Sequence, residues 1–160
     1  MSTASGMSVE LKTTDAACVA YIPMTGPYAQ IPAAMGRLFG WVARRGLVPA
    51  GMPSGVYLTD PAGGEETARW ELRAPLAGDL RDAPVDASGC GIKHVAAQLV
   101  ASAMYRGPYE RIAPAYAEIA AWIRSHGYAV AGPPEELYCS EPTTAPDDTL
   151  TEIRFPVAKP

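Results

Sequence analysis

Two segments decide the fold: GPYAQIPAAMGRLFGW at residues 26–41 and GPYERIAPAYAEIAAW at residues 107–122. They lie 81 residues apart, and the same offset aligns residues 18–77 with residues 99–158 without a gap. Of the 60 aligned pairs 18 are identical, whereas roughly five would be expected by chance from such a composition. The chain is therefore an internal duplication, and each repeat is one structural unit.

Each repeat has the pattern of a strand, a helix and two further strands. An apolar run suits a buried strand, and the Gly-Pro-Tyr turn that follows places a proline where a helix can begin. Each helix carries apolar residues at i, i+4, i+7 and i+11, which form a single stripe. Gly46 and Gly127 stand where a left-handed helix cap is expected.

The residues assigned to these elements correspond between the repeats. The helical stripes are Ile31, Met35, Leu38 and Val42 in the first repeat and Ile112, Tyr116, Ile119 and Ile123 in the second. The predicted strands are Cys18–Ile22, Val56–Asp60 and Ala68–Leu76, then Leu99–Ala103, Leu137–Glu141 and Leu150–Val157. The segments Ser8–Lys12 and Gly91–Val95 are candidates for a leading strand in each repeat.

These elements predict an α+β fold, a tandem pseudo-two-fold repeat of strand-helix-strand-strand units. Because neither repeat has enough core to stand alone, we expect an antiparallel sheet with the two main helices on one face. The repeats cover about residues 8–77 and 90–158 of a single domain, joined by a linker at 78–89. Residues 1–7 are expected to be disordered.

The composition indicates a soluble globular domain. Of the 160 residues 48% are hydrophobic and 19% are charged, and the net charge of −4 disfavours a basic nucleic-acid-binding face. No apolar run is long enough to span a membrane, and the N-terminus lacks the pattern of a signal peptide, so a cytoplasmic location is expected. The 17 residues before Cys18 are too few for a helix-turn-helix. We therefore expect no direct nucleic acid binding and no membrane contact.

The chain resembles the GyrI-like small-molecule-binding family over roughly residues 8–158. The resemblance rests on RGPY at 106–109, Trp122, Gly127-Tyr128, EELY at 135–138 and TEIRFPV at 151–157. The same domain is the effector-binding part of some AraC- and MerR-type multidrug regulators, and this chain is similar to stand-alone members. The resemblance implies binding of bulky, often aromatic and cationic, molecules in a cleft between the repeats, where a carboxylate at the position of Glu136 meets the positive charge.

Positions at which the repeats differ are the best candidates for function, because shared positions serve the shared fold. Gly55 corresponds to Glu136, so the expected cleft has space on one side and a negative charge on the other. A partly desolvated carboxylate attracts a cation more strongly than a solvated one. The alternative is an ordinary solvated glutamate at a strand edge.

Aromatic and apolar side chains complete the candidate ligand site. Trp70, which corresponds to Thr151, offers an indole that can stack on a flat ligand or face a cation. Core packing is its alternative. Two phenols, Tyr105 and Tyr138, are candidates for the rim of the cleft. Met35, Phe39 and Tyr116 are candidates for an apolar wall. Each of these residues could instead serve only the packing of the fold.

A catalytic role would use some of the same residues. The family also includes hydrolases that open the strained cyclopropane ring of DNA-alkylating antibiotics. Such a reaction needs a carboxylate that positions or deprotonates water and a donor that polarises a carbonyl. Glu136 or Glu152 would be the base, and Tyr138 or Tyr105 the donor. Glu152 has a competing role, since Glu71 and Glu152 each precede an arginine by two residues and predict polar pairs between strands.

No metal and no organic cofactor is expected. His94 and His126 are the only histidines, and neither has a second ligand at a suitable spacing. Cys18, Cys90 and Cys139 fit neither a disulfide framework nor a zinc site, and Cys18 and Cys139 are expected to be buried, inert thiols.

Three functions stay open from the sequence. The favoured one is a binding protein that senses or sequesters drug-like aromatic cations. The second is the cofactor-independent hydrolase. The third, also implied by the family, is a protein that modulates gyrase by interaction, although a net charge of −4 is slight for a nucleic acid mimic.

Overall fold

The computed structural model describes residues 7–59, 63–141 and 143–160, which divide into two compact units. Unit 1 combines the residues up to Thr14 with Gln98–Pro160, and unit 2 is Asp15–Ala97. Each unit is an antiparallel sheet with one main helix, so the predicted α+β class is confirmed.

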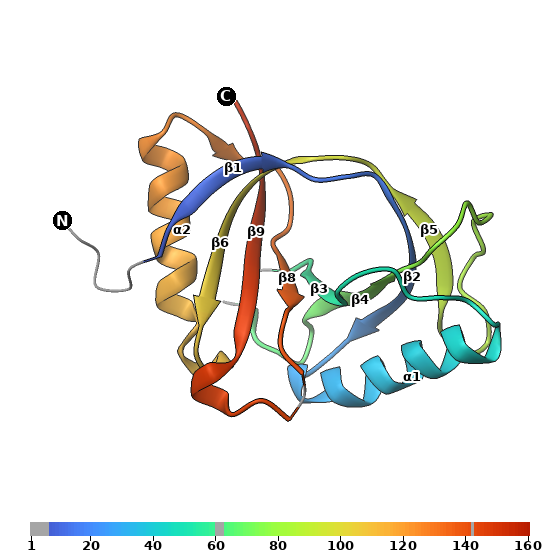
Figure 1. Cartoon of the computed structure of the whole chain (residues 1–160). Helices are drawn as coiled ribbons and strands as arrows, with labels where there is room; N and C mark the ends of the chain where they lie inside the picture. Colours follow the sequence, from blue (N-terminus) through green and yellow to red (C-terminus); the bar gives the residue numbers. More distant parts are fainter. Residues whose placement is uncertain (1–6, 60–62, 142) are drawn as a thin grey trace. The chain divides into compact units, whose positions relative to one another are not determined.

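Unit 2 is a four-stranded sheet in the order β3-β4-β2-β5. Its elements are β2 (Ala17–Thr25), the 3-10 helix η1 (Tyr28–Gln30), α1 (Ile31–Arg44), β3 (Ser54–Tyr57), β4 (Arg69–Pro75) and β5 (Gly91–Val95). All of these strand pairs are antiparallel. Helix α1 contacts the two central strands, β2 and β4, as Figure 1 shows.

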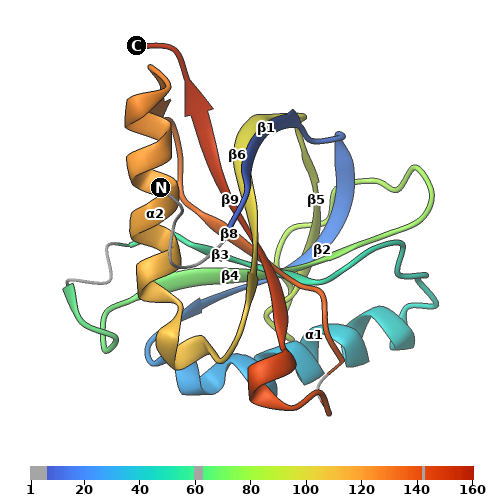
Figure 2. The same cartoon turned by 60° about the vertical axis from the view of Figure 1, so that its left-hand side comes forward.

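Unit 1 repeats this plan with the order β1-β6-β9-β8, and β7 pairs with the end of β9. Its elements are β1 (Val9–Thr13), β6 (Leu99–Arg106), the 3-10 helix η3 (Tyr109–Arg111), α2 (Ala113–Ser125), β7 (Ala129–Val130), β8 (Glu135–Tyr138), the 3-10 helix η4 (Pro146–Asp148) and β9 (Leu150–Ala158). Helix α2 contacts β6 and runs beside β6 and β9 in both Figure 1 and Figure 2.

The helices begin later than the Gly-Pro-Tyr turns predict. Each turn leads into a 3-10 helix, and the α-helices start at Ile31 and Ala113 with a proline in their first turn. Gly46 and Gly127 follow the helices with φ of 68° and 79°, as expected of left-handed caps. The predicted strands are all present with shifted ends, and the expected end at Asp60 lies outside the described residues.

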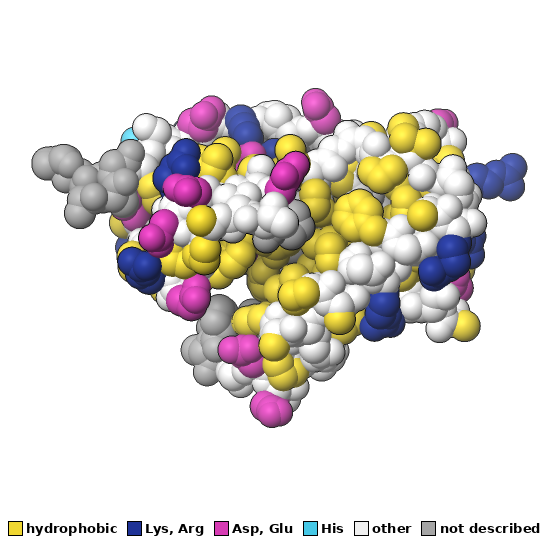
Figure 3. Space-filling view, turned by 60° about the horizontal axis from the view of Figure 1, so that its bottom comes forward, with side chains coloured by type: hydrophobic (Ala, Val, Ile, Leu, Met, Phe, Trp, Pro, Cys, Tyr) yellow, Lys and Arg dark blue, Asp and Glu magenta, His cyan; other side chains and the backbone are white. Residues whose placement is uncertain are grey.

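Each unit has its own hydrophobic core between helix and sheet. The predicted helical stripes face these cores: Leu38 and Val42 are buried in unit 2, and Ile119 and Ile123 are buried in unit 1. The expectation of disorder at residues 1–7 concerns mainly residues 1–6, which lie outside the described residues. Met7 is described and packs against the core of unit 1. The face shown in Figure 3 mixes Lys and Arg with Asp and Glu side chains.

The leading strand of each sequence repeat pairs with the sheet of the other repeat. β1 is the first strand of the first repeat but pairs with β6 in unit 1, and β5 is the first strand of the second repeat but pairs with β2 in unit 2. Lys12 and Lys93 occupy equivalent repeat positions on these strands, and each forms an ion pair with a buried glutamate of its host sheet. The compact units therefore differ from the sequence repeats by an exchange of leading strands.

This exchange predicts which amides depend on β1. A chain that begins at Asp15 should lose backbone protection in β6 by roughly tenfold or more, because the hydrogen bonds to β1 are gone. Protection in β2 should be retained, since its partners are β4 and β5. Hydrogen–deuterium exchange followed by mass spectrometry compares this chain with the full one. Loss of protection in β2 with β6 unchanged would contradict the exchange.

Candidate functional site

The helix-facing side of the unit 1 sheet brings Glu136 and Tyr138 together. Both lie on β8, and alternate residues of a strand share one face. Glu136 pairs in register with Ile153 on β9, and Tyr138 pairs with Thr151. Ile153 belongs to the core under α2. This face, which we call the Glu136 face, is therefore the one covered by α2.

Glu136 is a buried carboxylate that contacts α2. Its side chain accepts a hydrogen bond from the Tyr116 hydroxyl, and the residue is 7% exposed. A hydrogen bond to a carboxylate stabilises its ionised form. The Tyr116 ring in turn lies edge-to-face on Phe155, with centroids 5.5 Å apart. The alternative of an ordinary solvated glutamate is thereby wrong, and the carboxylate is bordered by aromatic rings.

A second aromatic pair lies beside Glu136. Tyr109 meets Tyr138 edge-to-face with ring centroids 6.1 Å apart. Partial burial of the phenol raises the pKa of Tyr109; the Thr151 hydroxyl opposes this rise and the negative charge of Glu136 adds to it. The ring of Tyr109 thus lies within electrostatic range of the carboxylate. The residue is nevertheless 48% exposed, so a ligand can reach it from solvent.

The repeat comparison shows that this cluster is specific to unit 1. Three of its members contact one another in a chain from Glu136 through Tyr116 to Phe155. The equivalent positions of unit 2 hold small or flexible apolar residues instead. The three pairs are Gly55 with Glu136, Met35 with Tyr116 and Ala74 with Phe155. A carboxylate and two aromatic rings therefore stand where the other copy has none.

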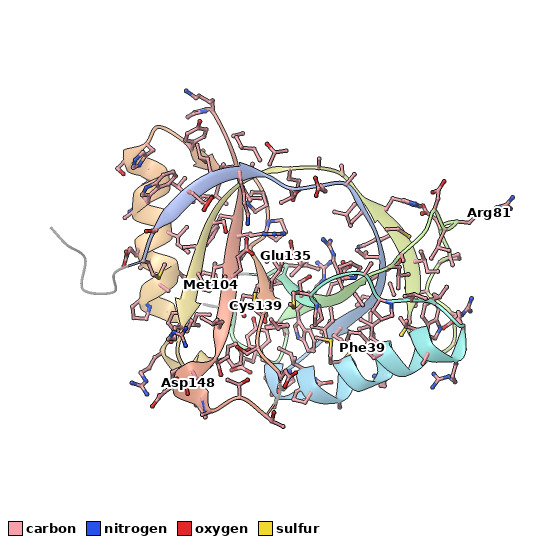
Figure 4. All side chains as sticks on the ribbon, viewed as in Figure 1. Phe39, Arg81, Met104, Glu135, Cys139 and Asp148 are labelled. Carbon is pink, nitrogen blue, oxygen red and sulfur yellow. The ribbon has the colours of Figure 1, made fainter. Side chains whose placement is uncertain are left out.

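The remaining ligand candidates of the first repeat lie in unit 2. Gly55 is buried on β3, and Met35 and Phe39 of α1 are partly buried against the core. Figure 4 shows Phe39 on the side of α1 that faces the strands. Trp70 has no exposed surface, and its indole N–H donates to the Gly26 carbonyl at 2.9 Å. A ligand could reach the Trp70 ring only after neighbouring side chains move.

Tyr105 and Trp70 each fix the Gly-Pro-Tyr turn of their own unit by a hydrogen bond. They do so from strands that are not equivalent in the two repeats, β6 in unit 1 and β4 in unit 2. The Tyr105 hydroxyl donates to the Pro108 carbonyl at 2.7 Å in unit 1, just as Trp70 donates to Gly26 in unit 2. Tyr105 pairs in register with Thr151 on β9, and Met24 pairs with Trp70 on β4. The large aromatic residue has thus changed strands between the repeats. Both rings anchor a Gly-Pro-Tyr turn.

Glu152 lies on the opposite face of the sheet from Glu136. It follows Thr151 on β9, and the Glu136 partner Ile153 follows it in turn. Its carboxylate accepts hydrogen bonds from Ser102 at 2.7 Å and Arg154 at 2.8 Å, and it pairs with Lys12 at 2.6 Å. The structure therefore does not bring Glu152 together with Glu136 and Tyr138.

The partners of Glu152 determine its acidity. Burial alone would raise the pKa of the carboxyl, but the hydrogen bonds from Lys12, Arg154 and Ser102 outweigh it and lower the pKa to about 2. Such a carboxylate is a weak base. Glu71 has equivalent partners, Arg73 at 2.6 Å and Lys93 at 2.8 Å. Polar pairs between strands are thus present in both units, but they are made by Lys12 and Lys93, whereas each arginine pairs with the glutamate of its own strand.

The histidines and cysteines form no recognisable site. Among the described residues no cluster of His, Cys, Asp or Glu is arranged to hold a metal ion. His126 stacks on Trp122, and His94 faces the exposed Asp82. Cys18 and Cys90 are buried, whereas Cys139 is only half-buried, and burial raises the pKa of all three thiols. Thiols of raised pKa are poor nucleophiles.

Comparison with known proteins gives the family. The GyrI-like small molecule binding domain profile matches residues 7–158. The chain belongs to this family. A search of curated protein sequences found no match. Within the part of the chain that the structure describes, neither helix is long and apolar enough to cross a membrane.

Solved structures share the GyrI-like fold at low sequence identity. The EcmrR C-terminal domain has a TM-score of 0.80 at 20% identity, covering 96% of this chain and 99% of that one. EcmrR in a DNA complex has a TM-score of 0.83 at 18% identity, covering 96% of this chain but only 58% of that one. A hydrolase from Listeria innocua has a TM-score of 0.72 at 15% identity, covering 94% and 91%. The ligand cleft expected between the repeats, the absence of nucleic acid binding and the cytoplasmic location stay predictions.

Sequence reasoning missed part of the site. Tyr116 was expected only as an apolar wall, yet it donates a hydrogen bond to Glu136. Tyr109 and Phe155 were not among the candidates, although Tyr109 borders Tyr138 and Phe155 borders Tyr116. Asymmetry between the repeats is a signal that could have found Phe155, because Ala74 occupies the equivalent position. Tyr109 is identical to Tyr28 and gives no such signal.

The lowered pKa of Glu152 makes unit 1 sensitive to acid. The pKa falls from an ordinary 4.5 to about 2 on folding, so the stabilisation is complete above pH 4.5 and is lost as the pH falls toward 2. It amounts to at most about 3 kcal/mol. Glu152→Gln should lower the free energy of unfolding at pH 7 by roughly 1–3 kcal/mol and weaken its dependence on pH below 5. Urea denaturation at pH 7 and at pH 3 measures both effects.

A matched control is Glu141→Gln, which removes an exposed carboxylate from the same unit. It should change the unfolding free energy by less than about 0.5 kcal/mol. Equal pH dependence in Glu152→Gln and the unmodified chain would show that the ion pairs do not hold this carboxylate ionised.

Proposed function

We propose that the chain binds bulky aromatic, often cationic, small molecules at the Glu136 face and so senses or sequesters such compounds. The observation that carries the proposal is a buried carboxylate, Glu136, bordered by aromatic rings. Membership in a small-molecule-binding family supports ligand binding in general.

The carboxylate supplies the attraction for a positive charge. Coulomb energy grows as the effective dielectric constant falls, so a buried carboxylate interacts more strongly with a cation than an exposed one does. The Tyr116 hydroxyl stabilises the anion without cancelling its charge, because a phenol is neutral. The net charge of −4 over 160 residues is modest. Recognition of a cation therefore depends on this local charge more than on the field of the whole protein.

The surrounding rings supply contact area for an aromatic ligand. Tyr109, Tyr138, Tyr116 and Phe155 form two edge-to-face pairs on the same unit as Glu136. Aromatic faces attract cations and also stack on flat rings. One structure with the same fold, that of SAV2435, is bound to tetraphenylphosphonium, at a TM-score of 0.58 and 16% identity. That ligand is a bulky aromatic cation, which supports the chemical class proposed here.

The electrostatic role of Glu136 can be tested with two ligands of similar shape. Glu136→Gln should weaken the binding of tetraphenylphosphonium roughly 10- to 100-fold, because it removes a charge-assisted contact. Neutral triphenylphosphine oxide should lose less than about threefold in the same variant, since it has no positive charge for Glu136 to attract. Isothermal titration calorimetry gives both dissociation constants.

The control variant is Glu135→Gln, which changes the neighbouring residue of β8 on the opposite face of the strand. It should leave both affinities within about twofold. Equal losses for the cation and the neutral compound in Glu136→Gln would rule out the electrostatic role.

A cofactor-independent hydrolase that opens strained cyclopropane rings is the second candidate. The placement of Glu136 and Tyr138 on one face of β8 favours it, because a carboxylate base and a phenol donor are the pair such a reaction needs. Glu152 is a poorer base, since its pKa is about 2 and it lies on the other face. Incubation with a cyclopropane-bearing alkylator, followed by mass spectrometry, separates the two functions. Turnover to a product one water heavier shows catalysis, whereas recovery of the intact compound from a bound complex shows binding alone.

A further inference from the structure

Thr151 on β9 carries an unsatisfied polar atom. The residue has no exposed surface, and among the described residues its Oγ1 is the only buried side-chain nitrogen or oxygen without a hydrogen-bond partner. A buried hydroxyl that lacks a partner destabilises a folded protein. A threonine at this position therefore lowers the stability of the fold unless its hydroxyl has another role.

Thr151 shares the face of Glu136. Glu136 pairs in register with Ile153, and Thr151 lies two residues before Ile153 on the same strand. The two side chains are therefore diagonal neighbours, at a typical separation of about 7–8 Å. A molecule that places a positive charge against Glu136 and extends along the diagonal reaches the Thr151 hydroxyl.

The other repeat shows what this position does when it serves the fold alone. Its equivalent is Trp70, whose ring fills the core and whose N–H is satisfied by the Gly26 carbonyl. In unit 1 the matching turn is held by Tyr105 from the next strand, so Thr151 is not needed as an anchor. Compared with Trp70, Thr151 therefore fills less of the core and lacks a hydrogen bond to the turn.

Tyr109 is the partly exposed side chain beside this position. The Thr151 hydroxyl is close enough to the phenol to lower the pKa of Tyr109, although its Oγ1 makes no hydrogen bond of normal distance and angle. Tyr109 is 48% exposed and lies in the short helix η3 that follows the Gly-Pro-Tyr turn. Access to the hydroxyl requires rotation of this partly exposed side chain, and exposed side chains change rotamer rapidly.

We propose that Thr151 is a specificity-determining residue whose hydroxyl forms a hydrogen bond with a hydroxyl or carbonyl group of the ligand. The inference rests on the proposed function and narrows its ligand class: an aromatic cation that also carries a polar group a few ångströms from its charge. A threonine hydroxyl can donate and accept, so both kinds of group fit. The ligand satisfies an atom that the fold leaves unpaired.

A matched pair of probes tests this inference. Tetraphenylphosphonium has no hydrogen-bonding group, and (4-hydroxymethylphenyl)triphenylphosphonium adds one hydroxyl, as an alcohol that does not ionise at neutral pH. The unmodified chain should bind the hydroxylated probe roughly five- to tenfold more tightly, the worth of one net hydrogen bond. Thr151→Val should abolish this preference and leave the affinity for tetraphenylphosphonium within about twofold. Thr151→Ser, which keeps the hydroxyl, should retain the preference.

Thermal unfolding of the free protein provides an independent readout. Thr151→Val should not lower the melting temperature, because the hydroxyl it removes has no partner in the fold. A fall of several degrees would show that the hydroxyl is paired within the protein and would overturn the inference. A preference that survives Thr151→Val, or no preference in the unmodified chain, would overturn it as well. Failure of the unmodified chain to bind either probe would instead overturn the proposed function on which it rests.

Discussion

The hydrogen bond between Tyr116 and Glu136 is the contact on which the candidate site depends. It joins α2 to β8 and keeps a carboxylate under the helix, where the core of unit 1 is otherwise apolar. A buried charge is costly unless neighbouring groups stabilise it. The phenol meets that requirement without neutralising the carboxylate, and the rings around it offer surface to a flat ligand. Charge and aromatic surface thus occur together on one unit.

The duplication allows each feature to be compared with an equivalent position in the same chain. Where the repeats agree, the shared residues make the same contacts: Glu71 and Glu152 each bind an arginine and a lysine. Where they disagree at Glu136, Tyr116 and Phe155, unit 1 has a carboxylate and two aromatic rings that unit 2 lacks. The contrast between Trp70, whose N–H is satisfied, and Thr151, whose hydroxyl is not, belongs to this second class. We therefore expect the functional residues in unit 1, although both units share the same fold.

The two carboxylates on neighbouring strands of unit 1 show how environment separates their roles. Glu152 is surrounded by cationic groups and holds the exchanged strand β1 through Lys12. Glu136 meets a phenol on the other face of the sheet. Strand alternation puts them on opposite faces although Glu136 and Glu152 are near neighbours in the register. The ion-paired carboxylate and the one proposed to bind a ligand thus lie on opposite faces because their positions differ by a single residue in the register.

The duplication, the α+β class and the residues that face the two cores can all be predicted from the amino-acid sequence, because hydrophobic periodicity and turn residues act locally. The sequence also singled out Glu136, since a glycine occupies the equivalent position in the other repeat. Only the tertiary structure decided that β1 and β5 are exchanged between the repeats, because strand pairing depends on long-range contacts that local patterns do not encode. The tertiary structure likewise placed Tyr116 on Glu136, separated Glu152 from both, and left Thr151 buried without a partner. These facts depend on register between β8 and β9 and on how α2 packs above them, and no residue pattern along the chain specifies either one.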